Sequence, residues 1–131
     1  AVVLAAGEVT VTLGDDPGRG GPNEEFALSA AVELADAGAA GDGVVVASVD
    51  TDGIDGATDA AGALIDDRLV GDGPERALSR DAAAAALDAH DAHPALDEAG
   101  ALLRTGPTGT NVNDLRVSVI PAGESRSEGT K

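Results

Sequence analysis

The sequence predicts an α/β domain on the basis of three observations. Candidate strands alternate with candidate helices along the chain, as in α/β folds. The 131 residues correspond to one domain, and 43% of them are hydrophobic, which is enough to form a core. That core must be aliphatic, because Phe26 is the only aromatic residue and there is no Met or Cys. We expect residues 1–120 to form the domain and residues 121–131, which are small and polar, to be a disordered tail.

The first part of the chain is expected to contain two strands and a helix, joined by a glycine-rich loop. The strands are Val2–Ala5 and Glu8–Leu13, of which the second alternates apolar and polar side chains. The loop, Gly14–Gly21, precedes a helix that Asn23 would cap and that runs to about Ala37. The stripe predicted to face the core has nearly helical spacing: Phe26, Ala30, Val32 and Leu34.

The middle of the chain predicts two further strands. Val44–Val49 is a nearly continuous apolar run, which is typical of a strand buried on both faces. Asp50–Thr58 follows it as an acidic loop punctuated by glycines. Ala60–Ile65 fits a strand or a helix by its pattern, and Gly62 favours the strand.

The last part of the chain predicts two helices and two strands. Asp81–His90 is the clearest helix, because it is rich in alanine and Asp81 can cap it. A shorter helix is expected from Pro94 to Glu98, with Pro94 at its first position. The strands Ala101–Leu103 and Leu115–Ile120 then close the sheet.

The formal net charge of −16 restricts the partners of the protein. Nucleic-acid binding needs clustered Lys and Arg, and the only lysine is Lys131, so no nucleic-acid partner is expected. Excess acid with few bulky hydrophobic residues is typical of halophilic proteins, in which molar salt shortens the Debye length to about 3 Å. We therefore expect stability to depend on salt.

The sequence also bears on chemistry and location. The lack of Cys excludes disulfides, thiolate catalysis and zinc sites that use Cys. No signal peptide or membrane-spanning segment is visible, so we expect no membrane partner and a cytoplasmic location. The chain begins at Ala1, inside a predicted strand and without a Met, which suggests a piece of a longer protein.

Thr105–Asp114 has the composition of a binding loop. It places Gly, Thr and Asn between two predicted strands and is longer than the two to five residues of an ordinary hairpin turn. Glycine allows close approach to a ligand, while Thr and Asn side chains hydrogen-bond. The candidate ligand-binding residues are Thr108, Gly109, Thr110 and Asn111. An irregular structural connection is the alternative.

Three segments, in order along the chain, resemble the MOFRL domain, which is the C-terminal half of the glycerate 2-kinase family. The first consists of Gly7–Val11, GEVTV, and Gly18–Glu25, GRGGPNEE. The second is Thr51–Gly62, TDGIDGATDAAG, and the third is Thr105–Asp114, TGPTGTNVND. The family pattern has an arginine where this chain has Pro22. The three segments together cover nearly the whole chain.

The resemblance implies a fold, an activity and partners. It implies a three-layer α/β/α arrangement with a mixed sheet of about six strands. It also implies ATP-dependent phosphorylation of D-glycerate, a sugar acid, to 2-phosphoglycerate with Mg²⁺. The active site would lie between this domain and a Rossmann-like N-terminal domain, so the isolated domain should fold but have little or no kinase activity. The alternatives are a hydroxypyruvate reductase and a non-catalytic binding or docking module.

The glycine-rich loop and the helix after it form a candidate phosphate site. The Gly18, Gly20 and Gly21 amides can point inward, and a helix N-terminus at Asn23 favours an anion. Arg19 is the only cation of the loop and could hold a phosphate or carboxylate through its guanidinium, so it is the candidate catalytic residue. A glycine-rich connector with a solvated arginine is the alternative.

The acidic loop after the predicted buried strand supplies two further candidates, Asp52 and Asp55. Ligands of open α/β sheets gather at the carboxyl ends of strands, where carboxylates can hold Mg²⁺ or hydrogen-bond a polyol. Turn and capping chemistry is the alternative, because each aspartate precedes a glycine.

No set of metal ligands is predicted. His90 and His93, near a helix end, receive no catalytic role, because a histidine there favourably interacts with the helix dipole.

Overall fold

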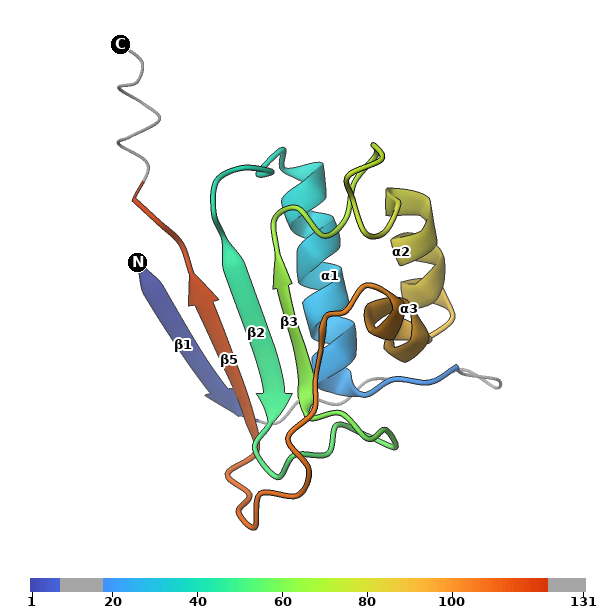
Figure 1. The fold of residues 1–131 in the computed structure, drawn as a ribbon. Coiled ribbons are helices and arrows are strands. Elements are labelled where there is room, and N and C mark those ends of the chain that lie inside the picture. The colour runs from blue at the N-terminus through green and yellow to red at the C-terminus, as the bar shows by residue number, and fades with distance from the viewer. Residues whose placement is uncertain (8–17, 123–131) are drawn as a thin grey trace.

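The computed structural model describes residues 1–7 and 18–122 and confirms the α/β class. Five strands form one sheet in the order β1-β5-β2-β3-β4 (Figure 1). The strands are β1 (Val2–Gly7), β2 (Val45–Asp50), β3 (Gly62–Asp66), β4 (Leu102–Leu103) and β5 (Asp114–Val119). The helices are α1 (Pro22–Asp36), α2 (Arg80–Asp88) and α3 (Ala92–Glu98). The predicted strand at residues 8–13, residues 14–17 of the glycine-rich loop, residues 8–11 of the first resembling segment and residues 123–131 of the predicted tail lie outside the described part.

The prediction of a mixed sheet is wrong, because every pair of neighbouring strands in the described sheet is antiparallel. The mixed sheet was implied by the resemblance to the family. In the structure, however, β5 lies between β1 and β2, so the strands that α1 connects are not neighbours. The connection from β2 to β3 contains no helix and returns the chain antiparallel. Neither a sixth strand nor a third layer is found in residues 1–7 and 18–122.

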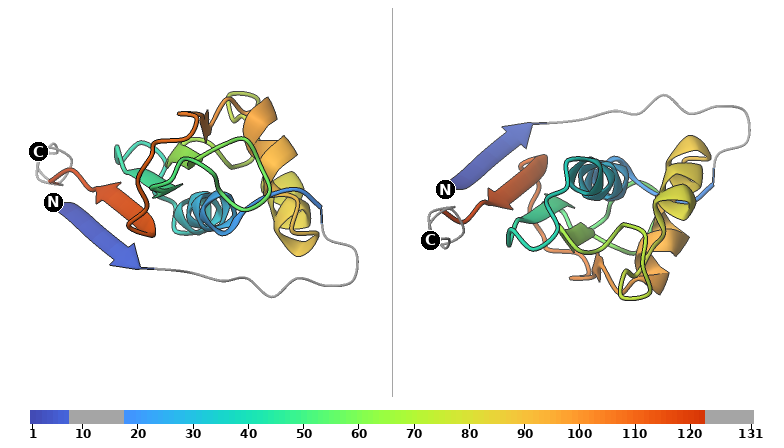
Figure 2. Two further views of the ribbon diagram at one scale, coloured as in Figure 1. Left: turned by 90° about the horizontal axis from the view of Figure 1, so that it is seen from below. Right: turned by 90° about the horizontal axis from the view of Figure 1, so that it is seen from above.

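The helices lie on one side of the sheet (Figure 2). Helix α1 packs on β2 and β3, and α2 and α3 pack against α1. The core is aliphatic, as predicted, and its largest fully buried apolar side chains are Leu28, Ile65 and Leu96. No helix of the described part is long and apolar enough to cross a membrane.

The buried stripe of α1 differs from the predicted one. It consists of small and aliphatic side chains three and four residues apart: Ala27, Leu28, Ala31 and Val32. Alanine at two of these positions allows the helix to approach the sheet closely. Phe26 is partly exposed at the edge of the helix, where the Arg116 guanidinium lies 3.9 Å from its ring centroid. The prediction followed the bulkiest side chains and therefore selected a neighbouring face.

The helix starts also differ from the predictions by a few residues. Helix α1 begins at Pro22 with Gly21 as its N-cap, so Asn23 lies inside the first turn. Helix α2 is capped by Ser79, whose hydroxyl accepts a hydrogen bond from the Ala82 amide, and not by Asp81. Pro94 occupies the third position of α3. In each case more than one residue near the start could serve as a cap.

The sheet face opposite α1 is apolar and largely uncovered. We call it the open face, and by strand register its apolar side chains are Val2, Leu4, Ala6, Val45, Ala47, Val49, Leu64, Leu115, Val117 and Val119. Asp66, which pairs with Val45, and Gly62, which pairs with Val49, lie on the same face. Leu4 is 67% exposed and Leu64 is 44% exposed. Val45 and Val49 are only partly buried, so the prediction that this strand is buried on both faces is wrong for this chain. Monomeric proteins rarely leave a contiguous apolar surface of this kind uncovered.

Candidate functional site

Three loops meet at the edge of the sheet where α1 begins (lower edge in Figure 1). We call them the glycine loop (residues 18–21), the aspartate loop (residues 51–61) and the threonine loop (residues 104–113). The aspartate loop lies between the other two: Gly56 is in close contact with Gly21, and Gly53 with Gly106. A Cβ atom at Gly53 would collide with the Gly106 carbonyl, so this junction requires glycine. The loops predicted to bind a ligand therefore form one continuous surface.

Asp55 joins the aspartate loop to the start of α1. Its carboxylate accepts hydrogen bonds from the Asn23 amide at 3.0 Å and from the Glu24 amide at 2.7 Å. These are amides of the first turn, which have no partner within a helix. Gly21, the N-cap residue, has no side chain that could accept these hydrogen bonds, so the Asp55 carboxylate takes the place of a capping side chain. Pro22 has no N–H and needs no acceptor. Asp55 is fully buried, and we therefore assign it a structural role.

Asn23 is the centre of a buried polar layer between α1 and the sheet. Its side-chain amide donates to Asp55 at 3.1 Å and to Asp114 at 2.9 Å. Its side-chain oxygen accepts from the Ser48 hydroxyl at 2.6 Å. Because Asn23 is buried and its side chain is fully engaged, the geometry favours a supporting role over ligand contact. Burial, followed by the nearby Asp52 and Asp114 carboxylates, raises the pKa of Asp50 beside this layer.

The glycine loop borders a cavity of about 350 Å³. Arg19 lies on its wall, and its guanidinium forms no ion pair with any residue of the described part. The carboxylate of Asp91 accepts a hydrogen bond from the Arg19 amide at 2.7 Å, which fixes the loop. The Gly18 amide donates to the Ala89 carbonyl, whereas no hydrogen bond within the described residues engages the Gly20 and Gly21 amides. Arg19, Gly20 and Gly21 thus remain available to an anion, and Gly18 is occupied.

The threonine loop is held by the aspartate loop through hydrogen bonds. The Thr108 hydroxyl donates to the Thr51 carbonyl at 2.6 Å, and the Thr108 amide donates to the Asp52 carbonyl at 3.2 Å. Asp52 itself accepts from the Ile54 amide in a local turn. Thr108 and Asp52 therefore shape the surface. Gly109, Thr110 and Asn111 are exposed at the loop tip, where they are open to a ligand. Two of their polar groups are engaged within the loop: the Thr110 amide donates to the Thr108 hydroxyl, and the Asn111 side-chain oxygen accepts from the Asn113 amide.

Two residues that sequence reasoning did not select, Glu25 and His90, also line the cavity of the glycine loop. The Nδ1 atom of His90 lies 2.8 Å from a carboxylate oxygen of Glu25. They are 65 positions apart in the sequence, so no local spacing could have revealed the pair. His90 has φ 51°, a left-handed conformation that costs a non-glycine residue about 1 kcal/mol.

Glu24 and His93 form a second pair, which lies in the core below the cavity. The two side chains meet at 2.7 Å between Glu24 Oε1 and His93 Nδ1. Burial, reinforced by the neighbouring Asp55 carboxylate, raises the pKa of Glu24 from 4.5 to about 8. Burial and the nearby Arg19 charge lower the pKa of His93. The pair therefore holds one shared proton and carries no net charge, as a buried pair requires.

Known proteins resemble this chain in sequence and in fold. The model of the MOFRL family matches residues 1–114. The chain belongs to the MOFRL family. The glycerate 2-kinase of Pyrococcus horikoshii is 38% identical over 126 residues, which cover 96% of this chain and 27% of that protein. A protein of Agrobacterium vitis with a provisional hydroxypyruvate reductase name is 48% identical over 92% of this chain and 26% of its own length.

A solved structure agrees with the family assignment. The crystal structure of glycerate kinase from Thermotoga maritima superposes with a TM-score of 0.77 at 39% identity, covering 92% of this chain and 27% of that one. This MOFRL chain therefore spans only about a quarter of the length of the relatives it matches. The remaining length of these relatives lies outside the matched region.

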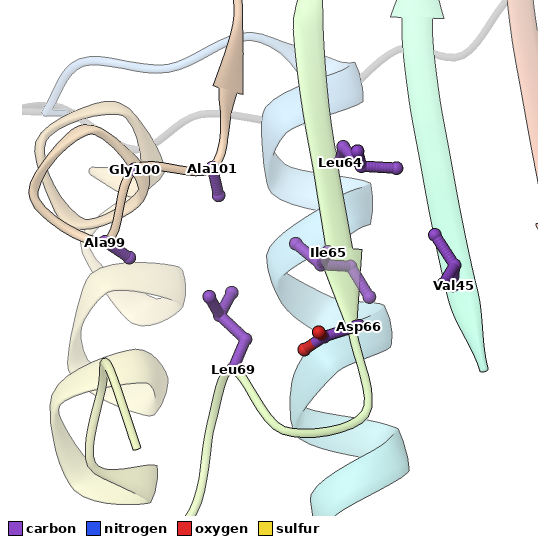
Figure 3. A pocket seen from close by; sticks show the side chains of 8 residues that line it. All are labelled: Val45, Leu64, Ile65, Asp66, Leu69, Ala99, Gly100 and Ala101. Carbon is purple, nitrogen blue, oxygen red and sulfur yellow. The ribbon is translucent and has the colours of Figure 1, made fainter. Parts of the chain in front are cut away.

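A second cavity of the MOFRL domain, of about 300 Å³, lies away from the three loops. Figure 3 shows its lining between β3 and the segment that enters β4, with Leu69 and Ala101 on one side and Leu64 on the other. Asp66 is the only charged residue that lines it. Because it offers almost no groups for chemistry, we place the candidate site at the glycine loop.

The Glu24–His93 pair predicts a pH dependence of stability for this MOFRL domain. Because the pKa of Glu24 rises from 4.5 to about 8 on folding, its contribution is complete below pH 4.5 and is lost as the pH rises through 8. The lowered pKa of His93 acts in the opposite direction below its ordinary value of 6.5. The fall in stability should therefore be clearest between pH 6.5 and 8.

Glu24→Gln is expected to flatten this fall, because glutamine keeps the size of the side chain but does not ionise. The measurement is urea unfolding of both chains at pH 6.5 and at pH 8. Glu33→Gln, which changes an exposed residue of the same helix, is the matched control and should retain the pH dependence of the unaltered chain. An equal loss of stability in all three chains would contradict the assignment.

Proposed function

We propose that this chain is the C-terminal domain of a glycerate 2-kinase. Its three loops would form one wall of a cleft in which ATP phosphorylates D-glycerate to 2-phosphoglycerate. The observation that carries the proposal is Arg19, a cation without an ion pair in the described part of an acidic chain, on the wall of a cavity of about 350 Å³. The relatives named glycerate kinase support it.

The chemistry of phosphoryl transfer fits these residues. Catalysis depends mainly on positioning and on neutralising charge at the transferred group. Arg19 can hold a phosphoryl or carboxylate group through its planar guanidinium, and the Gly20 and Gly21 amides can donate to the same anion. Thr110 and Asn111, at the tip of the threonine loop, are proposed to bind the sugar acid or the nucleotide. Asp52, Asp55, Asn23 and Thr108 hold the loops in place.

ATP and Mg²⁺ are the proposed cosubstrate and cofactor of the longer polypeptide. The described residues contain no group of three or more acidic or histidine side chains able to hold a metal ion. The residues described here therefore do not fit a resident Mg²⁺, and we propose that ATP and the rest of the polypeptide bind the ion. This division of labour agrees with the strongly acidic character of the chain, which suits it poorly to hold ATP alone.

The open face gives the proposed partner a place to bind. The relatives are almost four times as long as the matched region, and their additional length can cover an apolar sheet face that this chain leaves exposed. We propose that the upstream region, in the expected Rossmann-like fold, supplies the third layer over this face. A cytoplasmic location and adaptation to high salt remain part of the same proposal.

A reductase is the second candidate, because the Agrobacterium vitis relative carries that provisional name. Dinucleotide sites use a parallel sheet and a glycine fingerprint that opens a helix after a strand. The sequence has no G-x-G-x-x-G motif, and the described strands pair antiparallel. These two features favour the kinase. A purely structural docking module is favoured only by the open face and leaves the unpaired Arg19 without a role.

An activity assay tests the proposal. The kinase-length polypeptide, which joins this chain to the upstream region of its relatives, is expected to form ADP from ATP only when D-glycerate and Mg²⁺ are present. The 131-residue chain alone is expected to show little or no turnover. Oxidation of NADH or NADPH with hydroxypyruvate would support the reductase. Robust turnover by the isolated chain would contradict the assignment of one wall only.

A further inference from the structure

We propose that His90 and Glu25 are the general-base pair of this site. In this inference, which rests on the proposed kinase function, His90 removes the proton from the substrate hydroxyl, and Glu25 orients the imidazole. Both residues line the cavity that Arg19 borders. His90 follows the end of α2 and Glu25 belongs to the first turn of α1, so two rigid elements position the pair.

The geometry leaves one imidazole nitrogen free for the reaction. The 2.8 Å contact to Glu25 Oε1 places the proton of neutral His90 on Nδ1, because a carboxylate can only accept. No residue in the described part of the chain hydrogen-bonds Nε2, which is therefore the atom that can accept a proton. The side chains of His90 and Glu25 are 26% and 19% exposed, so the pair is sheltered but reachable.

The backbone at His90 is a second, independent observation. Helix α2 ends in hydrogen bonds from the His90 amide to the Leu87 carbonyl and from the Asp91 amide to the Ala86 carbonyl. This Schellman arrangement places the residue after the cap in the left-handed region, which glycine occupies best. His90 occupies that position with φ 51°. A strained residue on a cavity wall points to a use for its side chain.

The two histidines differ in what their surroundings permit. His93 is buried against Glu24 and has its second nitrogen 3.7 Å from Asp59, so it belongs to the core. His90 instead faces the cavity, and the charged groups around it are Glu25 from α1, Arg19 from the glycine loop and Asp91 beside it. Glu25 is the one of these groups that contacts the imidazole directly, at 2.8 Å, and Arg19 stands on the same cavity wall.

The proposed step balances in atoms and charge. The 2-hydroxyl oxygen of D-glycerate forms a bond to the γ-phosphorus of ATP, and the bond from that phosphorus to the bridging oxygen of ADP breaks. The hydroxyl proton passes to Nε2 of His90 and is then released to water. Arg19 lies on the same cavity wall and holds the transferring phosphoryl group or the carboxylate of the substrate.

His90→Gly in the kinase-length polypeptide separates catalysis from folding. Glycine relieves the left-handed backbone, so the melting temperature is expected to stay the same or rise. The kcat for D-glycerate should fall by about 10²–10⁴-fold with little change in KM, and the loss of rate at acid pH should disappear. His90→Asn, which tolerates the same backbone conformation, should give the same result. Activity within threefold of the unaltered enzyme with the acid limb retained would overturn the proposal.

Histidine-selective ¹⁵N spectra of the same polypeptide test the pair without any turnover. The spectra should show His90 as the Nδ1–H tautomer, and Glu25→Ala should shift it toward the Nε2–H form that predominates in free histidine. An unchanged tautomer would overturn the role of Glu25. If the unaltered enzyme does not phosphorylate D-glycerate, the proposed function fails, whereas a kinase that is insensitive to His90 refutes only this inference.

Discussion

Asp55→Ala is expected to lower the free energy of unfolding by about 3–4 kcal/mol. The substitution removes the acceptor of the Asn23 and Glu24 amides at the start of α1, both in buried surroundings. It also removes one partner of the Asn23 side chain. Each buried donor without a partner costs about 1–3 kcal/mol, and loss of a helix cap costs about 1 kcal/mol. One substitution causes all of these losses together, because the Asp55 carboxylate accepts from all three donors.

The measurement is urea unfolding of the 131-residue chain followed by circular dichroism. Asp88→Ala is the matched control: it removes one negative charge from an exposed position at the end of α2 and should change stability by no more than about 0.5 kcal/mol. The melting temperature of the Asp55 variant should fall by roughly 10–20 °C. Equal stability of the two variants would contradict the capping role of Asp55.

Arg19→Ala is expected to reduce kcat of the kinase-length polypeptide by about 10²–10³-fold. The reason is that Arg19 is the only arginine that lines the cavity of the glycine loop and forms no ion pair within the described residues. Without the Arg19 guanidinium, the negative charge of the transferring phosphoryl group would lose a positively charged partner. Folding should be nearly unaffected, because the side chain is exposed and the loop is anchored through backbone groups: the Arg19 amide donates to Asp91 and the Arg19 carbonyl accepts from the His93 amide.

Arg80→Ala is the matched control for the loss of one positive charge. Arg80 pairs with Asp36 at 2.9 Å on the surface and does not line the cavity, so its removal should leave kcat within about twofold. A further variant joins Arg19→Ala to Pro22→Arg, since Pro22 lines the same cavity and stands where the family pattern has arginine. Partial recovery of kcat is expected. Full activity of Arg19→Ala alone would remove this residue from the mechanism.

The element types were predictable from the sequence, whereas their arrangement was not. Periodicity located β2, α1 and α2 to within a few residues, because alternating and helical patterns are local. The strand order depends on β5 inserting between β1 and β2, which no local pattern encodes. The exposure of Leu4 and Leu64 could not be predicted either, because an apolar residue in a sequence gives no sign of whether another segment covers it.

The candidate site shows the same division. The glycine, aspartate and threonine loops were predictable from composition, and they do lie together. The separation of roles within them required coordinates, because Asp52 and Asp55 both precede glycine, yet Asp55 is buried as a cap. Glu25 and His90 were missed because helix packing alone brings them together.

The hydrogen bonds of Asp55 and Thr108 have a consequence for how ligands enter and leave. Asp55 fixes the aspartate loop to α1, and Thr108 fixes the threonine loop to the aspartate loop. None of these loops can swing aside as a lid without breaking those contacts. In the proposed kinase, the cleft would then open by displacement of the facing region as a whole. In that proposal, the rate of product release would depend on the movement of the facing region. Substitutions where the two regions join would then alter turnover without contacting a substrate.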